Sequence, residues 1–515
     1  MTLGERLSRT ASEHPGRTAL IFGGRRMSYR DLEDKAVRLA SGLSSLGVRA
    51  GDRVALLMGN SPEFVVAYFG VAKAGAAVVP MNTFLAAPEL AFILRHSGCL
   101  VLVTGPEFSG LMPALREGAP GLKHVVTAGG AGVAGRAGRP LPGAIEMEDL
   151  MREGASASPI EGVGSEGDPA AVLYTSGTTG RPKGAVLTHG NLLSNAGALA
   201  LSFRVTKRDR FLLFLPMFHA FSFLVCLLVP ISTGASVIIL PSIKPFSKVL
   251  KAVVFGRASF FVAIPQVYNI LAMKSFPKLL MRLLPLRLCV CGAAPLPAET
   301  LTRFAERFPF PLIEGYGLTE ASPVVSCNPL SGKRKPGSAG LPIPGVTVRV
   351  VDESGSGLPA GEVGEIVVSG PNVMQGYLND DAATRDAIRD GWLYTGDMGM
   401  LDREGYIYIV DRKKDLILVH GMNVYPREVE EVLYRHPAVA EAAVVGIPDE
   451  HMGEMPKAFI TLKEGGRLTE KEVREYLKGR LASYKIPRRV EFLDKMPMTR
   501  TGKVLKRELR ERTGL

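Results

Sequence analysis

The sequence has little of what a secreted, disulfide-stabilised protein needs. It contains five cysteines, an odd number without regular spacing, at Cys99, Cys226, Cys289, Cys291 and Cys327. Such usage favours free thiols in a reducing compartment over a disulfide framework. The N-terminal stretch MTLGERLSRTASEHPGRTAL also lacks an apolar core of signal-peptide length. We therefore expect a cytoplasmic protein.

Charge is missing from one long run, FLLFLPMFHAFSFLVCLLVPISTGASVIIL, between Phe211 and Leu240. Its length alone would permit a membrane span. However, Pro216, Pro230 and Gly234 interrupt it, because these residues disfavour a continuous helix. We expect a buried strand, a loop, a helix and a second strand here. A peripheral contact with the inner membrane surface and a homodimer both remain open.

The positive charge is unevenly distributed along the 515 residues. The net charge is +12, and the part from Tyr476 to Leu515 holds twelve Lys or Arg against four Asp or Glu. No array of aromatic residues accompanies these charges, so nucleic acid is not an expected partner. A phosphate-rich small molecule such as coenzyme A would account for them, and so would a solvated basic surface.

The pattern of apolar runs predicts an α/β fold with more than one domain. The chain exceeds the roughly 250–300 residues at which a single core stops growing. Strand-like and helix-like segments alternate over about the first 400 residues, which is typical of stacked α/β subdomains with largely parallel sheets. From Val346 to about Asp411, short alternating runs between glycines indicate a small antiparallel β subdomain. Residues 129–167, rich in Gly, Ala, Ser and Pro, are expected to form a surface loop.

The final hundred residues have a different pattern. VYPREVEEVLYRHP predicts an amphipathic helix that begins at a proline, and VAEAAVVGIPDE and KAFITLKEG predict strands. A further helix should begin after Thr469, with Glu472 completing a capping box. We therefore predict an N-terminal domain of residues 1–411 and a smaller, mobile α+β lid of residues 412–515.

The strongest chemical signal is the string YTSGTTGRPKGA, from Tyr174 to Ala185. It follows an apolar strand and combines five hydroxyl side chains with three glycines. Glycines let a backbone wrap closely around an anion, while amides and hydroxyls donate hydrogen bonds to it. The spacing differs from the Walker pattern. The candidate phosphate-binding residues are Thr175, Ser176, Gly177, Thr178, Thr179, Gly180 and Lys183.

This string closely resembles the phosphate loop of the AMP-forming adenylate ligases, which include acyl-CoA synthetases, peptide-synthetase adenylation domains and firefly luciferase. Four further strings resemble motifs of that family, in its order: EGYGLTE, YTGD, DRKKDLILVHGMNVYPREVE and PMTRTGKVLKREL. The matches run from about residue 170 to residue 510, and MSYRDL and GDRVALLMGNSPEF resemble its N-terminal region. The fatty acid–CoA ligases are the most similar members. The resemblance implies an AMP-binding N-terminal domain with a rotating lid.

By this resemblance, EGYGLTE forms the adenine and magnesium segment and YTGD the ribose segment. Tyr316 would stack its aromatic face on adenine. Thr319 would donate to the α-phosphate, and Glu320 would help to hold Mg²⁺, a hard cation that prefers oxygen ligands. Asp397 would accept both ribose hydroxyls. Outside the phosphate loop, the implied ATP- and AMP-binding residues are Gly292, Ala293, Ala294, Glu314, Gly315, Tyr316, Gly317, Asp397 and Arg412.

Three side chains, Lys503, His219 and Thr319, are implied in catalysis. Lys503 would neutralise charge on the carboxylate and the α-phosphate during adenylation, a contact whose removal typically costs about 10²–10³ in rate. His219, in LPMFHAF, would orient the carboxylate of the acid. A buried structural histidine is the alternative interpretation of His219.

Thioester formation would follow at the same centre, after rotation of the lid. Lys414 stands at the hinge position of the family. Rotation would bring VHGMN to the site and open a tunnel for pantetheine along Gly421, where this sequence has His420 instead of the commoner first glycine. Tyr484 and Lys485 would meet the phosphates of coenzyme A.

The resemblance therefore predicts an ATP- and Mg²⁺-dependent fatty acid–CoA ligase that forms an acyl-adenylate and then a thioester. The residues Phe218, Phe221, Val262 and Ile264 could line the acyl pocket, although they could equally be core. An aryl or short-chain acid–CoA ligase and a stand-alone enzyme that loads a carrier protein are alternatives. A luciferase-like oxygenase is more remote. A non-enzymatic binding module is disfavoured because it would leave Lys503, Asp397 and Glu320 unexplained.

Overall fold

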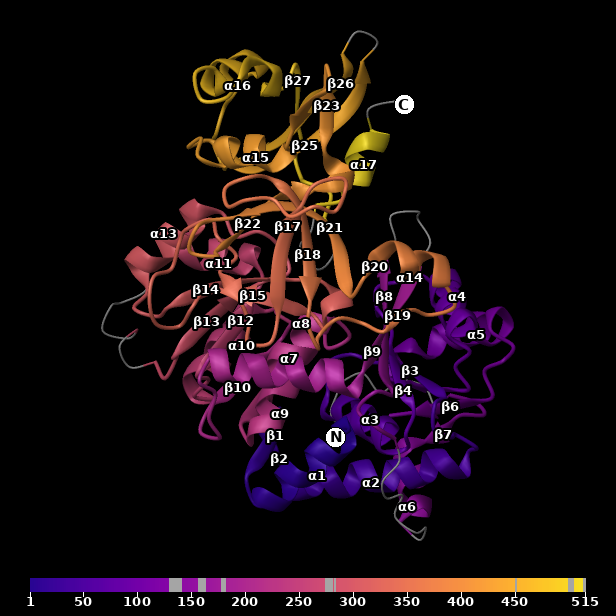
Figure 1. Ribbon diagram of the computed structural model, residues 1–515. Helices are drawn as coiled ribbons and strands as arrows, with labels where there is room; N and C mark the ends of the chain where they lie inside the picture. The colour runs from indigo at the N-terminus through magenta and orange to yellow at the C-terminus, as the bar shows by residue number, and fades with distance from the viewer. Residues whose placement is uncertain are drawn as a thin grey trace.

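The computed structural model describes residues 1–128, 141–155, 164–176, 182–273, 281, 284–449, 452–498 and 504–512. Two sheets with many parallel strands form the larger part, covered by helices (Figure 1). An antiparallel β subdomain lies between these sheets and a C-terminal α+β unit at the top of the view. The predicted α/β class is confirmed.

The first sheet has the strand order β16-β15-β14-β13-β12-β10-β11-β1-β2. From β14 to β1 neighbouring strands are parallel, and their sequences are nearly continuous apolar runs because both faces are buried. The bounds are β1 Thr18–Phe22, β2 Arg25–Ser28, β10 Arg210–Leu213, β11 Ser236–Ile239, β12 Phe260–Ala263, β13 Leu288–Cys291, β14 Leu312–Gly317, β15 Val324–Cys327 and β16 Leu341–Pro342.

The second sheet has the order β19-β9-β8-β4-β3-β5-β6-β7. Strands β8 and β9 pair antiparallel, so the candidate phosphate loop joins the ends of two adjacent strands. The bounds are β3 Arg53–Leu57, β4 Ala77–Pro80, β5 Val101–Thr104, β6 His124–Thr127, β7 Ile145–Glu146, β8 Pro169–Ser176, β9 Pro182–Thr188 and β19 Gly376–Tyr377.

Helices cover both sheets, and several begin at side-chain caps such as Ser28, Ser61 and Thr188. Their bounds are α1 Leu3–Glu13, α2 Tyr29–Ser45, α3 Pro62–Lys73, α4 Ala87–Ser97, η1 Pro106–Leu111, α5 Met112–Gly118, α6 Met147–Gly154, α7 His189–Ser202, α8 Ala220–Phe223, η2 Leu224–Leu228, α9 Val229–Thr233, α10 Phe246–Phe255, α11 Pro265–Met273, α13 Ala298–Arg307, η3 Thr319–Ala321 and α14 Asp381–Ala387.

The antiparallel β subdomain was predicted from residue 346 to about residue 411, and the structure confirms it. Its strands pair in the order β17-β18-β21-β20, with β22 also on β21. The bounds are β17 Thr347–Val351, β18 Gly364–Ser369, β20 Ile388–Arg389, β21 Trp392–Leu401 and β22 Ile407–Arg412, followed by η4 Lys413–Asp415.

The C-terminal unit has a hydrophobic core of its own, formed by buried residues between Ile417 and Leu509. Thr469 and Glu472 form the predicted capping box at α16. The predicted domain boundary at 411/412 falls inside β22 and stays a prediction. The bounds are β23 Ile417–Val419, β24 Met422–Val424, α15 Pro426–Tyr434, β25 Val439–Asp449, β26 Gly453–Leu462, α16 Glu470–Leu477, η5 Ser483–Lys485, β27 Arg489–Phe492 and α17 Lys506–Glu511.

The charge-free run from residue 211 to residue 240 folds as expected, into β10, a loop, α8, η2 and α9, and then β11. Most of its side chains are buried against the two sheets, which explains the lack of charge. In the part of the chain that the structure describes, no helix is long and apolar enough to cross a membrane. All five cysteines are free and buried, also as predicted.

The prediction of a surface loop over residues 129–167 is wrong in part. Residues 129–140 and 156–163 lie outside the described residues, but β7 and α6 lie between these two segments. Helix α6 buries Met147, Leu150 and Met151 against α2. The spacing of these apolar residues is typical of a helix. The segment is so short that its pattern does not stand out from the surrounding glycines and alanines.

Helices α2 and α6 pack so closely that Gly154 has no room for a side chain. A Cβ atom added there would lie 2.1 Å from the carbonyl oxygen of Arg38. Gly154→Ala should therefore lower the unfolding free energy by about 1–3 kcal/mol, as overpacking does, and lower the Tm in differential scanning fluorimetry. In the matched control Gly197→Ala, nothing lies within 4 Å of the new Cβ, so the Tm should stay or rise. Equal effects of the two changes would contradict this account of the packing.

Candidate functional site

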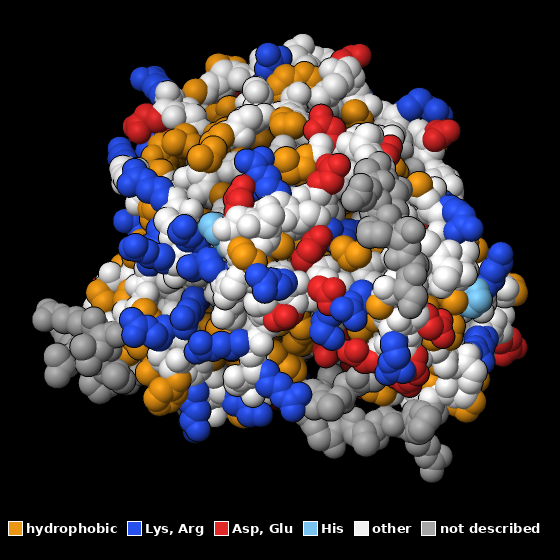
Figure 2. Space-filling model, turned by 90° about the horizontal axis from the view of Figure 1, so that it is seen from below, with side chains coloured by type: hydrophobic (Ala, Val, Ile, Leu, Met, Phe, Trp, Pro, Cys, Tyr) orange, Lys and Arg blue, Asp and Glu red, His pale blue; other side chains and the backbone are white. Residues whose placement is uncertain are grey.

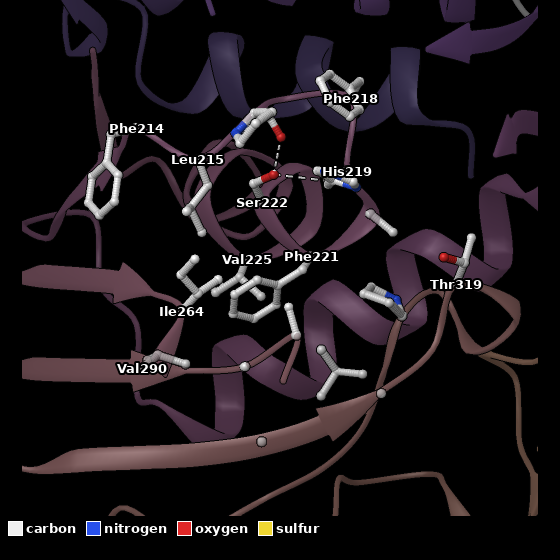
Figure 3. Close-up of a pocket in the computed structure, with 18 of the residues that line it drawn as sticks. Phe214, Leu215, Phe218, His219, Phe221, Ser222, Val225, Ile264, Val290 and Thr319 are labelled. Atoms are coloured by element: carbon white, nitrogen blue, oxygen red, sulfur yellow. Dashed lines mark hydrogen bonds between the residues drawn. The ribbon is translucent and has the colours of Figure 1, made fainter. Parts of the chain in front are cut away.

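A cavity of about 400 Å³ opens where the carboxyl ends of β10, β12, β13 and β14 meet helix α7. The close-up in Figure 3 shows Phe221, Val225 and Ile264 pointing toward one another in this cavity, with Thr319 on a separate segment. Its apolar lining includes Leu199, Phe203, Phe214, Leu215, Phe218, Phe221, Val225, Ile264, Val290 and Val324. Of the described residues that line the cavity, none is Lys, Arg, Asp or Glu.

The loop that carries His219 is anchored by a buried asparagine from another part of the chain. The side-chain amide of Asn60, three positions after the end of β3, donates to the carbonyl oxygens of Leu215 at 2.9 Å and Leu240 at 3.2 Å. Its side-chain oxygen accepts the N–H of Met217 at 2.8 Å. Three hydrogen bonds from one buried side chain thus fix the loop against both sheets.

Aromatic rings surround His219 within this loop. The ring of Phe218 lies 4.4 Å from the ring of His219 and 5.8 Å from the ring of Phe84, which is 40% exposed. Ser222 donates from Oγ to the carbonyl oxygen of His219 at 3.2 Å, one of the contacts drawn in Figure 3. His219 and Phe221 both line the cavity, as does Phe218. The structure therefore brings these predicted residues together.

The candidate adenine and ribose segments meet on the other side of the cavity. The O–H of Tyr316 donates to Asp397 Oδ2 at 2.7 Å, and Arg412 Nε lies 3.2 Å from Asp397 Oδ1. Asp397 is 5% exposed. Burial raises the pKa of Tyr316, and the Asp397 charge adds to this, so the phenol remains a donor. Three residues taken from motifs far apart in the sequence thus form one hydrogen-bonded group.

Gly292, in the candidate adenine loop, packs against the apolar lining of the cavity. A Cβ atom at Gly292 would lie 2.8 Å from the ring of Phe221. Ala293 has a positive φ of 68°, which turns this loop sharply. Gly292, Ala293, Gly315 and Gly317 line the cavity with Tyr316, while Ala294 is half-buried beside them, and their role in binding a nucleotide stays a prediction.

Glu314 lies beneath this loop and does not line the cavity. Its Oε1 accepts the backbone N–H of Leu296 at 2.9 Å, so the carboxylate fixes the loop that begins at Gly292. Burial raises the pKa of Glu314 from its ordinary 4.5 to about 7. The predicted nucleotide residue Glu314 is therefore placed to support the loop by this contact.

The oxygen-bearing residues near the phosphate loop converge on Glu320. Thr175 Oγ1 lies 3.5 Å from Glu320 Oε1, and Tyr377 donates to the same oxygen at 2.9 Å. Hydroxyl and carboxylate oxygens are the ligands that Mg²⁺ prefers, and it usually keeps waters and substrate phosphates as further ligands. Within the described ranges, no cluster of three His, Cys, Asp or Glu could hold a metal. Glu320 and Thr175 therefore suit Mg²⁺ only when a bound nucleotide supplies further ligands to the ion.

Part of the predicted site lies outside the described residues. Gly177, Thr178, Thr179, Gly180 and Lys503 belong to this part. Ser176 ends β8 and Lys183 lies in β9, so the two ends of the phosphate loop are placed. Lys183 Nζ lies 5.1 Å from the ring centroid of Tyr377.

Val262 is the exception among the predicted acyl-pocket residues. Its side chain is fully buried in the hydrophobic core, and Val262 does not line the cavity. The reason is its position inside β12, where side chains pack between the sheet and its covering helices. Ile264, one residue beyond that strand, does line the cavity.

The predicted hinge and coenzyme A residues lie on the C-terminal side. Lys414 is exposed in η4, between β22 and β23. His420 and Gly421 have φ values of 50° and 76° and form the turn between β23 and β24. Lys485 pairs with Glu428 at 2.7 Å, next to Tyr484 in η5.

Two residues that stabilise the site, Asn60 and Tyr377, are not predicted from the sequence. Both act through partners far away in the chain, so no local pattern reveals them. The one available signal for Asn60 is a polar residue three positions after the end of a buried strand.

The surplus of positive charge does not lie only at the C-terminus. Figure 2 shows a face on which Lys and Arg gather over one half. Arg17, Arg26 and Arg257 lie close enough to lower the pKa of Arg210, after the larger effect of burial. These residues lie around the first sheet, away from the cavity lining.

Comparison with known proteins gives consistent similarities along the whole chain. A family model described as AMP-binding enzyme matches residues 7–378, and one described as AMP-binding enzyme C-terminal domain matches residues 428–503. A feruloyl-CoA synthase from Amycolatopsis sp is 39% identical over 99% of both chains. A long-chain-fatty-acid–CoA ligase from Bacillus subtilis (strain 168) is 36% identical over 99% of this chain and 94% of the relative.

Solved structures are also similar to this chain over nearly its whole length. The crystal structure of ATP-bound MatB from Rhodopseudomonas palustris matches with a TM-score of 0.90 and 33% identity over 99% of both chains. A Mycobacterium tuberculosis fatty acyl CoA synthetase matches with a TM-score of 0.76 and 35% identity, over 99% of this chain and 98% of the other.

The raised pKa of Glu314 predicts how stability depends on pH. Because the pKa is about 7 in the folded protein and near 4.5 otherwise, the folded state holds the extra proton between these values. Stability from Glu314 is therefore complete below about pH 4.5 and is lost as pH rises through 7. Glu314→Gln keeps the acceptor for Leu296 and removes this loss. Its Tm relative to wild type should rise between pH 5 and pH 8, by an amount that corresponds to about 3 kcal/mol. A difference independent of pH would show that Glu314 is not protonated in the folded protein.

Proposed function

We propose that this chain, which belongs to the AMP-binding enzyme family and is an AMP-forming acid–CoA ligase, acts on fatty acids of medium or long chain. The observation that carries the proposal is the cavity. It includes candidate nucleotide residues, and its described lining is mostly apolar and holds no Lys, Arg, Asp or Glu. An alkyl chain can be desolvated there at no electrostatic cost.

The same lining disfavours acids with a second carboxylate. A buried carboxylate is costly unless it is paired, and the described lining offers neither Lys nor Arg. We therefore assign the cavity to a monocarboxylic, apolar acid. The relatives named above include a long-chain-fatty-acid–CoA ligase, which supports this assignment.

Adenylation would begin with the acid carboxylate held near His219 and the nucleotide on the opposite side of Gly292. Tyr316 would stack on adenine, and Asp397, held by Tyr316 and Arg412, would accept the ribose hydroxyls. The carboxylate oxygen would attack the α-phosphate in line, with pyrophosphate as the leaving group. Holding both reactants in one cavity supplies much of the rate, because the substrate oxygen is itself the nucleophile.

The phosphates would be held by the loop between β8 and β9 together with Lys183 and Thr319. Mg²⁺, held by Glu320 and Thr175 with the nucleotide, would neutralise charge on the phosphate oxygens. Lys503 would approach the carboxylate and the α-phosphate from the C-terminal unit. Its removal should slow adenylation by about 10²–10³.

Thioester formation would require the C-terminal unit to rotate about Lys414. In the present arrangement, the N–H of Arg427 donates to Asp411 Oδ2 at 2.8 Å, and Arg510 lies 2.6 Å from Asp415. The first contact crosses the hinge and would have to break as the turn at Gly421 moves toward the acyl-adenylate, whereas the second lies within the rotating unit and would move with it. Tyr484 and Lys485, which is paired with Glu428 in the same unit, would meet the phosphates of coenzyme A.

An aryl acid is the second candidate substrate. The feruloyl-CoA synthase is 39% identical over nearly the full length, more than the fatty-acid relatives named above. The rings of Phe221 and Phe203 in the cavity lining would also suit a planar aromatic acid. The two candidates differ in which acid the cavity prefers, so one panel of acids distinguishes them.

The substrate is tested by measuring AMP formation with ATP and Mg²⁺ over acetate, octanoate, palmitate, oleate, benzoate, ferulate and malonate, with and without coenzyme A. We expect the largest kcat/KM for octanoate, palmitate or oleate, and AMP release that depends on coenzyme A. Malonate should be the poorest substrate because its second carboxylate would be buried without a partner.

A preference for ferulate or benzoate would replace the fatty-acid assignment with an aryl one. Pyrophosphate exchange without net thioester would indicate a carrier-protein acceptor instead of coenzyme A. Turnover of malonate at the rate of palmitate would contradict the argument from the uncharged cavity.

The hinge is tested by Lys414→Pro. Proline fixes φ and so restricts the backbone change that rotation needs. We expect pyrophosphate release to be retained, while thioester formation from supplied acyl-AMP falls at least tenfold. The exposed neighbour Lys413, replaced by alanine, serves as the control, and it should affect neither half-reaction as strongly. Thioester formation at the full rate in Lys414→Pro would mean that the hinge lies elsewhere.

A further inference from the structure

Tyr377 connects the phosphate loop to the candidate magnesium ligand. Its O–H donates to Glu320 Oε1 at 2.9 Å, and Lys183 Nζ lies over its ring, 5.1 Å from the centroid. One side chain thus contacts two residues of opposite charge on separate segments. The motifs that predicted the site contain both partners but not Tyr377.

The backbone fixes the position of Tyr377. It pairs with Ala185 where β19 lies beside β9, directly after the phosphate loop (Figure 1). The N–H of Tyr377 donates to Thr384 Oγ1 at 2.8 Å, and the N–H of Leu378 donates to the carbonyl oxygen of Gly184 at 2.8 Å. The ring is therefore held in place before any ligand arrives.

The same segment also holds the main chain of Glu320. The N–H of Met374 donates to the carbonyl oxygen of Glu320 at 2.9 Å. The carboxylate then receives Tyr377 on Oε1, which also lies 3.5 Å from Thr175 Oγ1. Both side-chain contacts use Oε1, so within the described part of the chain Oε2 is the oxygen left to a cation.

We propose that Tyr377 is a positioning residue for magnesium-linked nucleotide binding: its hydroxyl orients the Glu320 carboxylate, and its ring places the Lys183 ammonium. The inference rests on the proposed function, which takes Glu320 as a magnesium ligand and Lys183 as a phosphate contact. The two contacts are separable, because the hydroxyl serves the metal and the ring serves the phosphates.

The chemistry of the phenol suits this role, because a tyrosine hydroxyl is neutral and has one hydrogen to donate. A neutral donor orients the carboxylate without cancelling its charge, whereas a lysine at this position would compete with the cation.

The test measures ATP binding without any acid or coenzyme A, by isothermal titration calorimetry in MgCl₂ and in EDTA. In Tyr377→Phe, the affinity in EDTA should match wild type, while the gain in affinity on adding Mg²⁺ should shrink about ten- to a hundredfold, as expected for a lost hydrogen bond to a charged group. In Tyr377→Leu, the affinity in EDTA should fall as well, because Lys183 loses the ring beneath it.

Tyr406 provides a matched control in the β subdomain. Lys335 Nζ lies 4.4 Å from its ring centroid, and its O–H donates to the carbonyl oxygen of Lys333. Tyr406→Phe therefore also removes one hydrogen bond from a tyrosine whose ring lies beside a lysine, but its acceptor is a backbone carbonyl away from Glu320. Its binding of ATP should match wild type in both buffers. Glu320→Gln serves as the reference for loss of the magnesium-dependent gain.

The proposal is overturned if Tyr377→Phe keeps the full magnesium-dependent gain, or if it loses affinity equally in EDTA. A loss of the same size in Tyr406→Phe would also overturn it. These outcomes are independent of the acid. If no acid is turned over while Tyr377→Phe still loses the magnesium-dependent gain, the proposed substrate fails and the role of Tyr377 stands.

Discussion

The register of β14 between its two neighbours is the constraint on which the site depends. This strand pairs in parallel with β13 and antiparallel with β15. Residues two apart in the strand, such as Glu314 and Tyr316, therefore face the same side. Glu314 supports the loop at Gly292, and Tyr316 reaches Asp397 in the β subdomain. A shift by one residue would turn both side chains to the opposite face and break both contacts.

The fold places an apolar and a highly polar environment side by side, and the chemistry needs both. Under the proposed function, the chain of the acid would leave water for the cavity, while its carboxylate would meet the triphosphate. The polar side is supplied by short segments at strand ends, such as the one that ends at Glu320. The buried hydrogen bonds of Asn60 fix the loop that carries His219, and they do so without placing a charge in the cavity.

The sequence predicts most of the fold, because the fold depends on local signals, whereas the nucleotide residues are inferred by resemblance to a family and stay predictions. Apolar runs in the sequence indicate the strands β3 and β13. The glycine-rich segment around Tyr316 can be compared with the motifs of a known family. The sequence is a weaker guide to which residues line the apolar cavity. Val262 and Ile264 are equally apolar, and only the end of β12 decides which of them lines the cavity. Tyr377 was missed because its partner, Glu320, lies in another segment, and such pairings are fixed only by tertiary structure.

The contact between Gly292 and Phe221 means that, under the proposed function, the acid and the nucleotide would share a wall. Anything that displaces the ring of Phe221 would also press on the loop that begins at Gly292, since Gly292 has no side chain to absorb the movement. Thermodynamic linkage would then make the effect mutual: an acid that changes the affinity for ATP must itself be bound with an affinity changed by the same factor. Substrate selection would then be partly a property of the pair of ligands and not of the acid alone.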